Sequence, residues 1–109
     1  MNKIPVAVLA ATGSVGQRFV QLLDNHPWFE VVALTGSERG QGKPYGEVCR
    51  WLFPEPMPEW AAKMPVLPSE AQALKGARLA FSALPADTAR QVEPALAQAG
   101  IAVCSNASA

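Results

Sequence analysis

The hydrophobic pattern of the first third of the chain alternates between strand-like and helix-like segments. Residues 4–9 (IPVAVL) form a short apolar run that is typical of a strand buried on both faces. Between residues 15 and 23 the apolar positions recur at steps of three and four, which predicts a helix with one buried stripe. Residues 24–27 (DNHP) end that helix, and residues 29–34 (FEVVAL) predict a second strand. This order predicts one βαβ unit with parallel strands and a right-handed crossover.

The middle of the chain is less regular. Residues 36–46 contain four glycines and predict a loop, and residues 45–52 predict a short additional helix. Residues 54–68 contain five prolines, which predict an irregular surface excursion. A polyproline ligand is the alternative there, but the prolines lack PxxP regularity and stand among apolar residues.

The last third returns to the alternating pattern. Residues 77–84 (ARLAFSAL) predict a strand, and residues 87–99 predict a helix that Gly100 ends. Pro94 lies inside that helix and is expected to kink or split it. Residues 101–104 (IAVC) predict a final strand. Strands that alternate with helices indicate an α/β fold, here a Rossmann-like parallel sheet with flanking helices. Because no helix follows the last strand, we expect an incomplete dinucleotide-binding domain from a longer enzyme.

Composition narrows the possible partners. The 109 residues carry 9 basic and 9 acidic side chains, so the net charge is zero, which argues against nucleic acid as a partner. The longest run without polar residues, 4–11, is far shorter than the roughly 20 residues that span a membrane. A signal peptide is the alternative reading of that run, but Pro5 and the glycine motif that follows disfavour it. Two cysteines make neither a disulfide scaffold nor a zinc site, so we expect a soluble cytoplasmic protein.

The strongest chemical signal is the turn between the first strand and the first helix. It reads Ala10-x-x-Gly13-x-x-Gly16, with Thr12 and Ser14 as additional donors. Small residues at this point let a pyrophosphate approach the backbone and the helix N-terminus. Ala10 stands where a glycine is usual, and we expect it to be tolerated with some loss of affinity unless its φ is positive, when strain would be larger. The alternative is a tight turn that binds no ligand.

A second signal follows the second strand. A carboxylate at this place usually binds the ribose hydroxyls of NAD, whereas Arg suits the 2′-phosphate of NADP. The chain has Ser37, Glu38 and Arg39 here. Ser37 can donate to a phosphate and Arg39 can pair with one, so we favour NADP, although Glu38 leaves NAD or a merely solvated loop as alternatives.

Other reactive side chains give weaker signals. Cys104 ends a strand but has no neighbouring His in the sequence, so we expect a buried, inert thiol, and we expect the same of Cys49. The single His26 is expected to be a solvated residue at a helix end. The carboxylates show no metal-ligand spacing, so we predict no metal site and assign no catalytic residue.

Five segments together resemble the aspartate-semialdehyde dehydrogenase family, in the branch shared by archaea, fungi and some bacteria. They are residues 8–19 (VLAATGSVGQRF), 26–31 (HPWFEV), 37–46 (SERGQGKPYG), 81–85 (FSALP) and 105–108 (SNAS). The resemblance implies an enzyme that reduces β-aspartyl phosphate to aspartate semialdehyde with NADPH, in lysine, threonine and methionine biosynthesis. A Cys thiolate and an acid/base His would carry out that reaction.

The resemblance also implies which residues bind NADP. By position, the pyrophosphate contacts are the turn residues, the 2′-phosphate contacts follow the second strand, and the remaining contacts lie near the ribose and the nicotinamide. These residues are Thr12, Gly13, Ser14, Val15, Ser37, Arg39, Ser82, Ala83 and Asn106.

The resemblance sets the expected domain organisation. Residues 1–109 correspond to an N-terminal NAD(P)-binding domain, and the catalytic and dimerisation domain, with the nucleophilic Cys and the His, is absent from this chain. The parent enzyme is expected to be a homodimer or homotetramer, and the chain alone inactive. The alternatives are malonyl-CoA reductase, another NADP-dependent acyl reductase, and a non-catalytic nucleotide-binding module.

Overall fold

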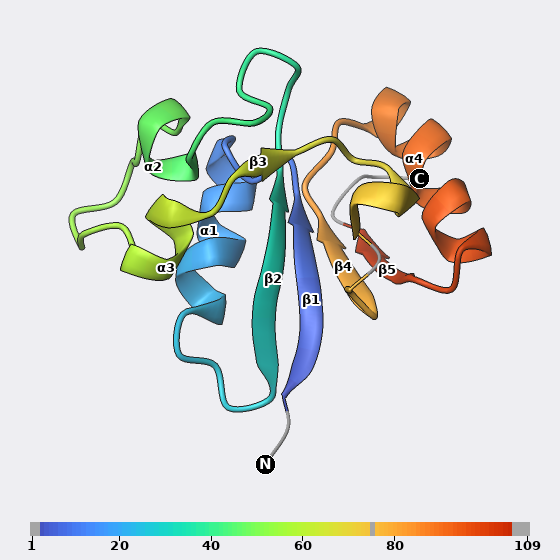
Figure 1. Ribbon diagram of the computed structural model, residues 1–109, viewed down its shortest axis with the longest axis horizontal. Coiled ribbons are helices and arrows are strands. Elements are labelled where there is room, and N and C mark those ends of the chain that lie inside the picture. The colour runs from blue at the N-terminus through green and yellow to red at the C-terminus, as the bar shows by residue number, and fades with distance from the viewer. Residues whose placement is uncertain (1–2, 75, 106–109) are drawn as a thin grey trace.

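The protein folds around one parallel β-sheet (Figure 1). The computed structural model describes residues 3–74 and 76–105, and within them five strands pair in the order β3-β2-β1-β4-β5. Every pairing is parallel, and β1 lies at the centre. This confirms the predicted α/β class and the Rossmann-like sheet. The strands are β1 (Ile4–Leu9), β2 (Phe29–Thr35), β3 (Val66–Leu67), β4 (Leu79–Ser82) and β5 (Ala102–Ser105).

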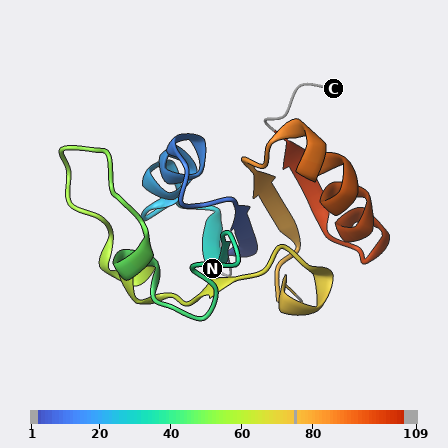
Figure 2. The same ribbon diagram turned by 90° about the horizontal axis from the view of Figure 1, so that it is seen from above.

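Helices cover both faces of the sheet (Figure 2). The α1 helix packs on one face and the 3₁₀ helix η1 on the other, as the view from above shows. None of the helices in the described ranges has the length and apolar character to cross a membrane. The helical segments are α1 (Ser14–Leu23), α2 (Tyr45–Val48), α3 (Glu59–Lys63), η1 (Ala71–Leu74) and α4 (Ala86–Gln98).

The central strand divides the core into two clusters. Val6 and Val8 pack with α1 on one face, whereas Ala7 and Leu9 pack with η1 and α4 on the other. All four side chains are fully buried, as the unbroken apolar run predicted. The strand is therefore a rigid base for the turn that follows it.

The prediction for residues 54–68 was wrong in one respect. The segment contains α3 and the edge strand β3, where an irregular excursion was expected. β3 has two residues between Pro65 and Pro68, and proline is compatible with a sheet edge. Backbone bonds hold it in place: the Val66 N–H donates to the Lys43 carbonyl, and the Leu67 carbonyl accepts from Gly36.

The α4 helix continues through Pro94 and is not split. Its carboxyl end has the predicted glycine, with Gly100 at φ +88°. The Ile101 N–H donates to the Leu96 carbonyl and the Gly100 N–H to the Ala97 carbonyl, which is the Schellman arrangement. Ile101 and Leu96 are both buried, so the same turn directs the chain into β5.

Candidate nucleotide-binding site

A pocket of about 880 Å³ lies at the carboxyl ends of the central strands. The chain leaves β1 toward β2 on one side, and β4 pairs with β1 on the other, so the strand order reverses between β1 and β4. Ligands of open α/β sheets bind in the crevice at such a reversal. The loops that follow β1, β2, β3 and β4 all contribute to the lining.

The turn after β1 adopts the conformation that glycine favours. Ala10 has φ +58°, a left-handed conformation that is strained for alanine, so the larger strain expected for a positive φ is present. Gly16 is required by packing, because a Cβ there would lie 2.1 Å from the Ala10 carbonyl oxygen and 2.6 Å from the Ala11 Cα. The first turn of α1 therefore packs directly against the end of β1.

Gly13 has a different reason to be glycine. Its φ of −80° suits any residue, and a Cβ there would meet no protein atom closer than 3.9 Å. Gly13 lines the pocket and directly precedes Ser14 and Val15 in the first turn of α1, which line it too. Among the residues that the structure describes, no side chain caps this helix end. The bare glycine and the uncapped amides form an opening suited to an anionic group.

The residues after β2 divide between two adjacent pockets. Ser37 and Glu38 line the main pocket, whereas Arg39 lines a neighbouring one of about 320 Å³ that shares Thr12 and Ser37 with it. Arg39 is exposed. Within residues 3–74 and 76–105, the side chains that form an ion pair are Arg90 and Asp87. No carboxylate in that range pairs with Arg39, so its positive charge is not neutralised.

Of the two predicted residues near β4, one lines the pocket and the other is buried beneath it. Ala83 lines the pocket. Ser82 is fully buried, and its Oγ accepts a bond from the Leu84 N–H at 3.4 Å, so its side chain supports the loop from below. Asn106 lies outside the described residues. In all, the structure brings Thr12, Gly13, Ser14, Val15, Ser37 and Ala83 into one pocket, with Arg39 beside it.

Three buried polar side chains under the turn were not singled out by the sequence analysis. Gln17, Thr35 and Tyr45 are almost completely buried, and each bonds to the turn's backbone. The apolar positions of α1 did not identify Gln17, because they placed the buried stripe on the side of Val15 and Leu22, which are exposed, whereas the buried side is formed by Gly16, Gln17, Val20 and Leu23. The other two required knowledge of which elements meet.

Burial also sets the protonation of two groups near the turn. Burial raises the pKa of the Tyr45 hydroxyl far above its ordinary value, and Cys49 beside it adds to the rise. Burial likewise raises the pKa of the Cys49 thiol. Both groups are therefore neutral near pH 7, and the expectation that Cys49 is buried is confirmed.

Two other expectations need correction or refinement. Cys104 is exposed, not buried, because β5 is an edge strand and the described residues place no helix over its side chain. His26 is half-buried, and its Nδ1 accepts bonds from the backbone N–H groups of Trp28 and Phe29. It shapes the turn into β2. The described residues contain no cluster able to hold a metal ion.

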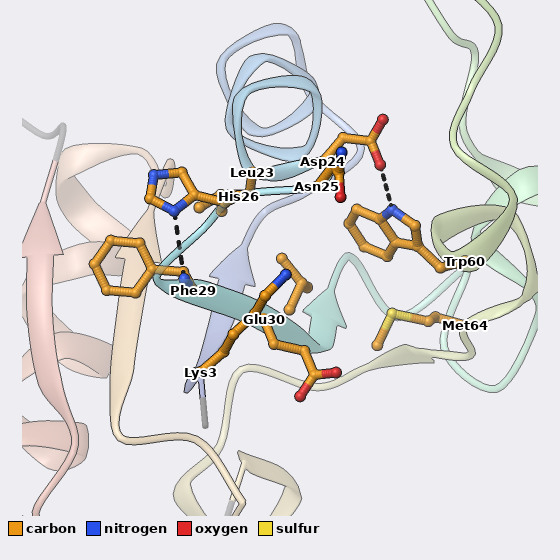
Figure 3. A pocket seen from close by; sticks show the side chains of 10 residues that line it. Lys3, Leu23, Asp24, Asn25, His26, Phe29, Glu30, Trp60 and Met64 are labelled. Carbon is orange, nitrogen blue, oxygen red and sulfur yellow. Dashed lines mark hydrogen bonds between the residues drawn. The ribbon is translucent and has the colours of Figure 1, made fainter. Parts of the chain in front are cut away.

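A second pocket, of about 700 Å³, lies at the opposite end of the strands, beside the amino ends of β1 and β2. Figure 3 shows Trp60 bonded to Asp24 on one side and His26 beside Phe29 on the other. Lys3 precedes β1 and Phe29 begins β2, so this pocket is separated from the Ala10 turn by the length of the central strand.

Comparisons with known proteins agree with the geometry. Residues 5–109 match the family described as semialdehyde dehydrogenase, NAD binding domain. The chain is 52% identical over 106 residues to the aspartate-semialdehyde dehydrogenase of Methanothermobacter thermautotrophicus, covering 97% of this chain and 30% of that protein. It is 44% identical over 100 residues to the enzyme of the same name from Saccharomyces cerevisiae, covering 92% and 27%.

A solved structure gives the same result. The fold matches a crystal structure of aspartate semialdehyde dehydrogenase with NADP from Candida albicans with a TM-score of 0.92 and 40% identity, over 97% of this chain and 30% of that chain. The chain thus spans about 30% of the length of the archaeal relative. On this evidence the chain belongs to the semialdehyde dehydrogenase family and corresponds to its NAD-binding domain.

Proposed function

We propose that the chain binds NADP(H) and is the cofactor-binding part of an aspartate-semialdehyde dehydrogenase. The observation that carries the proposal is the pocket at the strand-order reversal, with an uncapped helix end and a glycine that packing does not require. A pyrophosphate supplies the negative charge that such an opening stabilises. Thr12, Gly13, Ser14 and Val15 would hold it.

The neighbouring pocket supports NADP over NAD. A 2′-phosphate carries negative charge, and the planar guanidinium of Arg39 would pair with it while Ser37 donates a hydrogen bond. Glu38 lines the main pocket instead, where its carboxylate suits ribose hydroxyls. In this proposal Ala83 contacts the ribose and Asn106 lies near the nicotinamide, while the buried Ser82 supports the loop that carries Ala83.

The reaction proposed for the whole enzyme is the reductive dephosphorylation of β-aspartyl phosphate to aspartate semialdehyde. Bound NADPH supplies the hydride, and the residues above orient it. The reaction also needs a nucleophilic Cys and an acid/base His. We assign neither role to Cys49, Cys104 or His26, so residues 1–109 form a cofactor domain whose catalytic partner belongs to the whole enzyme.

The remaining parts of the proposal concern partners and location. The zero net charge favours a small-molecule cofactor over nucleic acid. Two free cysteines suit the reducing cytoplasm. A homodimer or homotetramer is the assembly we propose for the whole enzyme, following its relatives.

The test compares two glycine variants by calorimetric titration with NADP⁺. Gly13→Ala places a methyl group in the opening without backbone strain, so we expect unchanged stability and an affinity lower by about tenfold or more. Gly100→Ala is the control, because its φ of +88° makes the variant less stable while its position after α4 leaves NADP⁺ affinity unchanged. Absence of NADP⁺ binding by the unmodified chain, or equal binding by Gly13→Ala, would refute the proposal.

A further inference from the structure

The backbone of the nucleotide-binding turn is held from the protein side by three side chains, two of which lie far away in the sequence. The Ala10 N–H donates to Thr35 Oγ1 at 3.0 Å, and the Tyr45 hydroxyl donates to the Ala11 carbonyl at 2.6 Å. Gln17 Nε2 donates to the Thr12 carbonyl at 2.9 Å. None of the three donor or acceptor side chains lines the pocket.

These contacts determine which backbone groups remain for a ligand. The carbonyls of Ala11 and Thr12, which would repel an anion, are occupied by donors from Tyr45 and Gln17. The amides of the following residues, at the start of α1, are the groups that a helix N-terminus presents. Tyr45 and Gln17 therefore bond the turn's carbonyls on the protein side, whereas Thr35 accepts from the Ala10 N–H and fixes the start of the turn.

Burial shows that these polar groups do more than fill space. Thr35 and Tyr45 have no exposed surface, and Gln17 is 1% exposed. Burial of a hydroxyl or an amide is unfavourable unless its bonds are made, and apolar side chains of the same size would fill the same volume at less cost. Gln17 makes three bonds, the other two joining it to the Arg50 carbonyl and the Leu52 N–H.

The same side chains connect the walls of the pocket to one another. Thr35 Oγ1 also bonds to Ser69 Oγ at 2.6 Å, and Ser69 lines the pocket. Gln17 ties the segment after α2 to the turn, and Tyr45 begins α2 itself. The turn, the end of β2, the α2 segment and the loop after β3 are therefore fixed relative to one another.

We propose that Thr35, Tyr45 and Gln17 are positioning residues that hold the Ala10–Gly13 turn, with Ala10 in its left-handed conformation, in the shape that binds the cofactor's pyrophosphate. The inference rests on the proposed NADP(H) binding and assigns it a set of residues that never touch the nucleotide. Because both nucleotides share the pyrophosphate, loss of this support weakens NADP⁺ and NAD⁺ by the same factor.

The test uses a matched pair at position 35. Thr35→Val keeps the shape and loses the hydroxyl, whereas Thr35→Ser keeps the hydroxyl and loses a methyl group. Nucleotide affinity is measured by calorimetric titration at a temperature where circular dichroism shows that each variant is folded. We expect Thr35→Val to bind NADP⁺ and NAD⁺ about five- to tenfold more weakly than the unmodified chain does. Thr35→Ser should remain within about twofold of the unmodified chain. The opposite order would overturn the proposal, since a purely packing role depends on the methyl group.

Tyr45→Phe provides an independent measurement should Thr35→Val fail to fold. It should lower the affinity for both nucleotides by a similar factor, with their ratio unchanged. Phe29→Leu is the control, because it weakens the core at the amino end of β2, far from the turn, and should leave affinity unchanged. Unchanged binding by Tyr45→Phe, or an equal loss in Phe29→Leu, would overturn the proposal. If the unmodified chain binds no NADP⁺, the proposed function itself fails.

Discussion

Replacement of Ala10 by glycine should stabilise the protein, although the substitution removes a methyl group. Ala10 has φ +58°, a conformation that costs an L-residue about 1–2 kcal/mol. Glycine removes that strain but gains about 0.5–1 kcal/mol of backbone freedom in the unfolded chain. Loss of the half-buried methyl group lowers the stability by roughly 0.4 kcal/mol more, which is half of the value for a fully buried carbon. The net expectation is a gain of about 0.4 kcal/mol, which raises Tm by about 1.5–3 °C for a chain of this size.

Asn25 is the matched control for this prediction. It has φ +56° at the far end of α1, and asparagine adopts this conformation with less strain than alanine does. Asn25→Gly should therefore leave Tm unchanged or lower it slightly. Both variants are measured by thermal denaturation followed by circular dichroism. A fall in Tm for Ala10→Gly, or an equal rise in both variants, would refute the assignment of strain to Ala10.

The same two variants separate strain from binding. Ala10 lines the pocket, so removal of its methyl group should raise NADP⁺ affinity by about two- to threefold. Asn25 lies at the opposite end of the strands and lines the second pocket, so its replacement should leave the affinity unchanged. A change in NADP⁺ affinity of the same size in both variants would contradict the placement of the nucleotide at the Ala10 turn.

Three further predictions follow from backbone geometry and burial. Gly16→Ala forces a Cβ to within 2.1 Å of the Ala10 oxygen, so urea denaturation should show a loss of about 3 kcal/mol; a loss below 1 kcal/mol would contradict the close packing. Stability should fall above about pH 10 at about 1.4 kcal/mol per pH unit, because burial raises the pKa of Tyr45 and the folded state keeps a proton that the unfolded state loses. In denaturation measured against pH, Tyr45→Phe should flatten that slope. Gly100→Ala should cost about 1 kcal/mol through its left-handed φ alone, since no atom lies within 4 Å of the added Cβ, and an unchanged Tm would contradict this.

The sequence predicted the four strands that have an apolar run of three or more residues, although only β1 has a long continuous buried stretch. β1 matched its predicted residues because an unbroken apolar run is typical of a strand that is buried on both faces. β3 was missed because it has two residues and is held by backbone bonds to Gly36 and Lys43, which no side-chain pattern reveals. The exposure of Cys104 was missed for a related reason, since burial of an edge strand depends on which elements pack over it.

Part of the candidate site could be predicted from the sequence, and part of it depends on contacts between distant elements. The spacing of Gly13 and Gly16 placed the turn correctly, because a short turn between a strand and a helix is a local structure. The support beneath it was not predictable from the sequence. Thr35 and Tyr45 reach turn residues 25 and 34 positions away, and only the folded sheet brings them together.

The central claim is that this chain holds NADP(H) through the turn after β1 and the Arg39 side chain. The most direct test is calorimetric titration of the unmodified chain and of Arg39→Ala with NADP⁺ and NAD⁺ in phosphate-free, low-salt buffer. We expect the unmodified chain to bind NADP⁺ more tightly than NAD⁺, and Arg39→Ala to lose about tenfold or more for NADP⁺ with NAD⁺ almost unchanged. Equal losses for the two nucleotides, or no loss for either, would contradict the placement of the 2′-phosphate at Arg39, and absence of all binding would contradict the site itself.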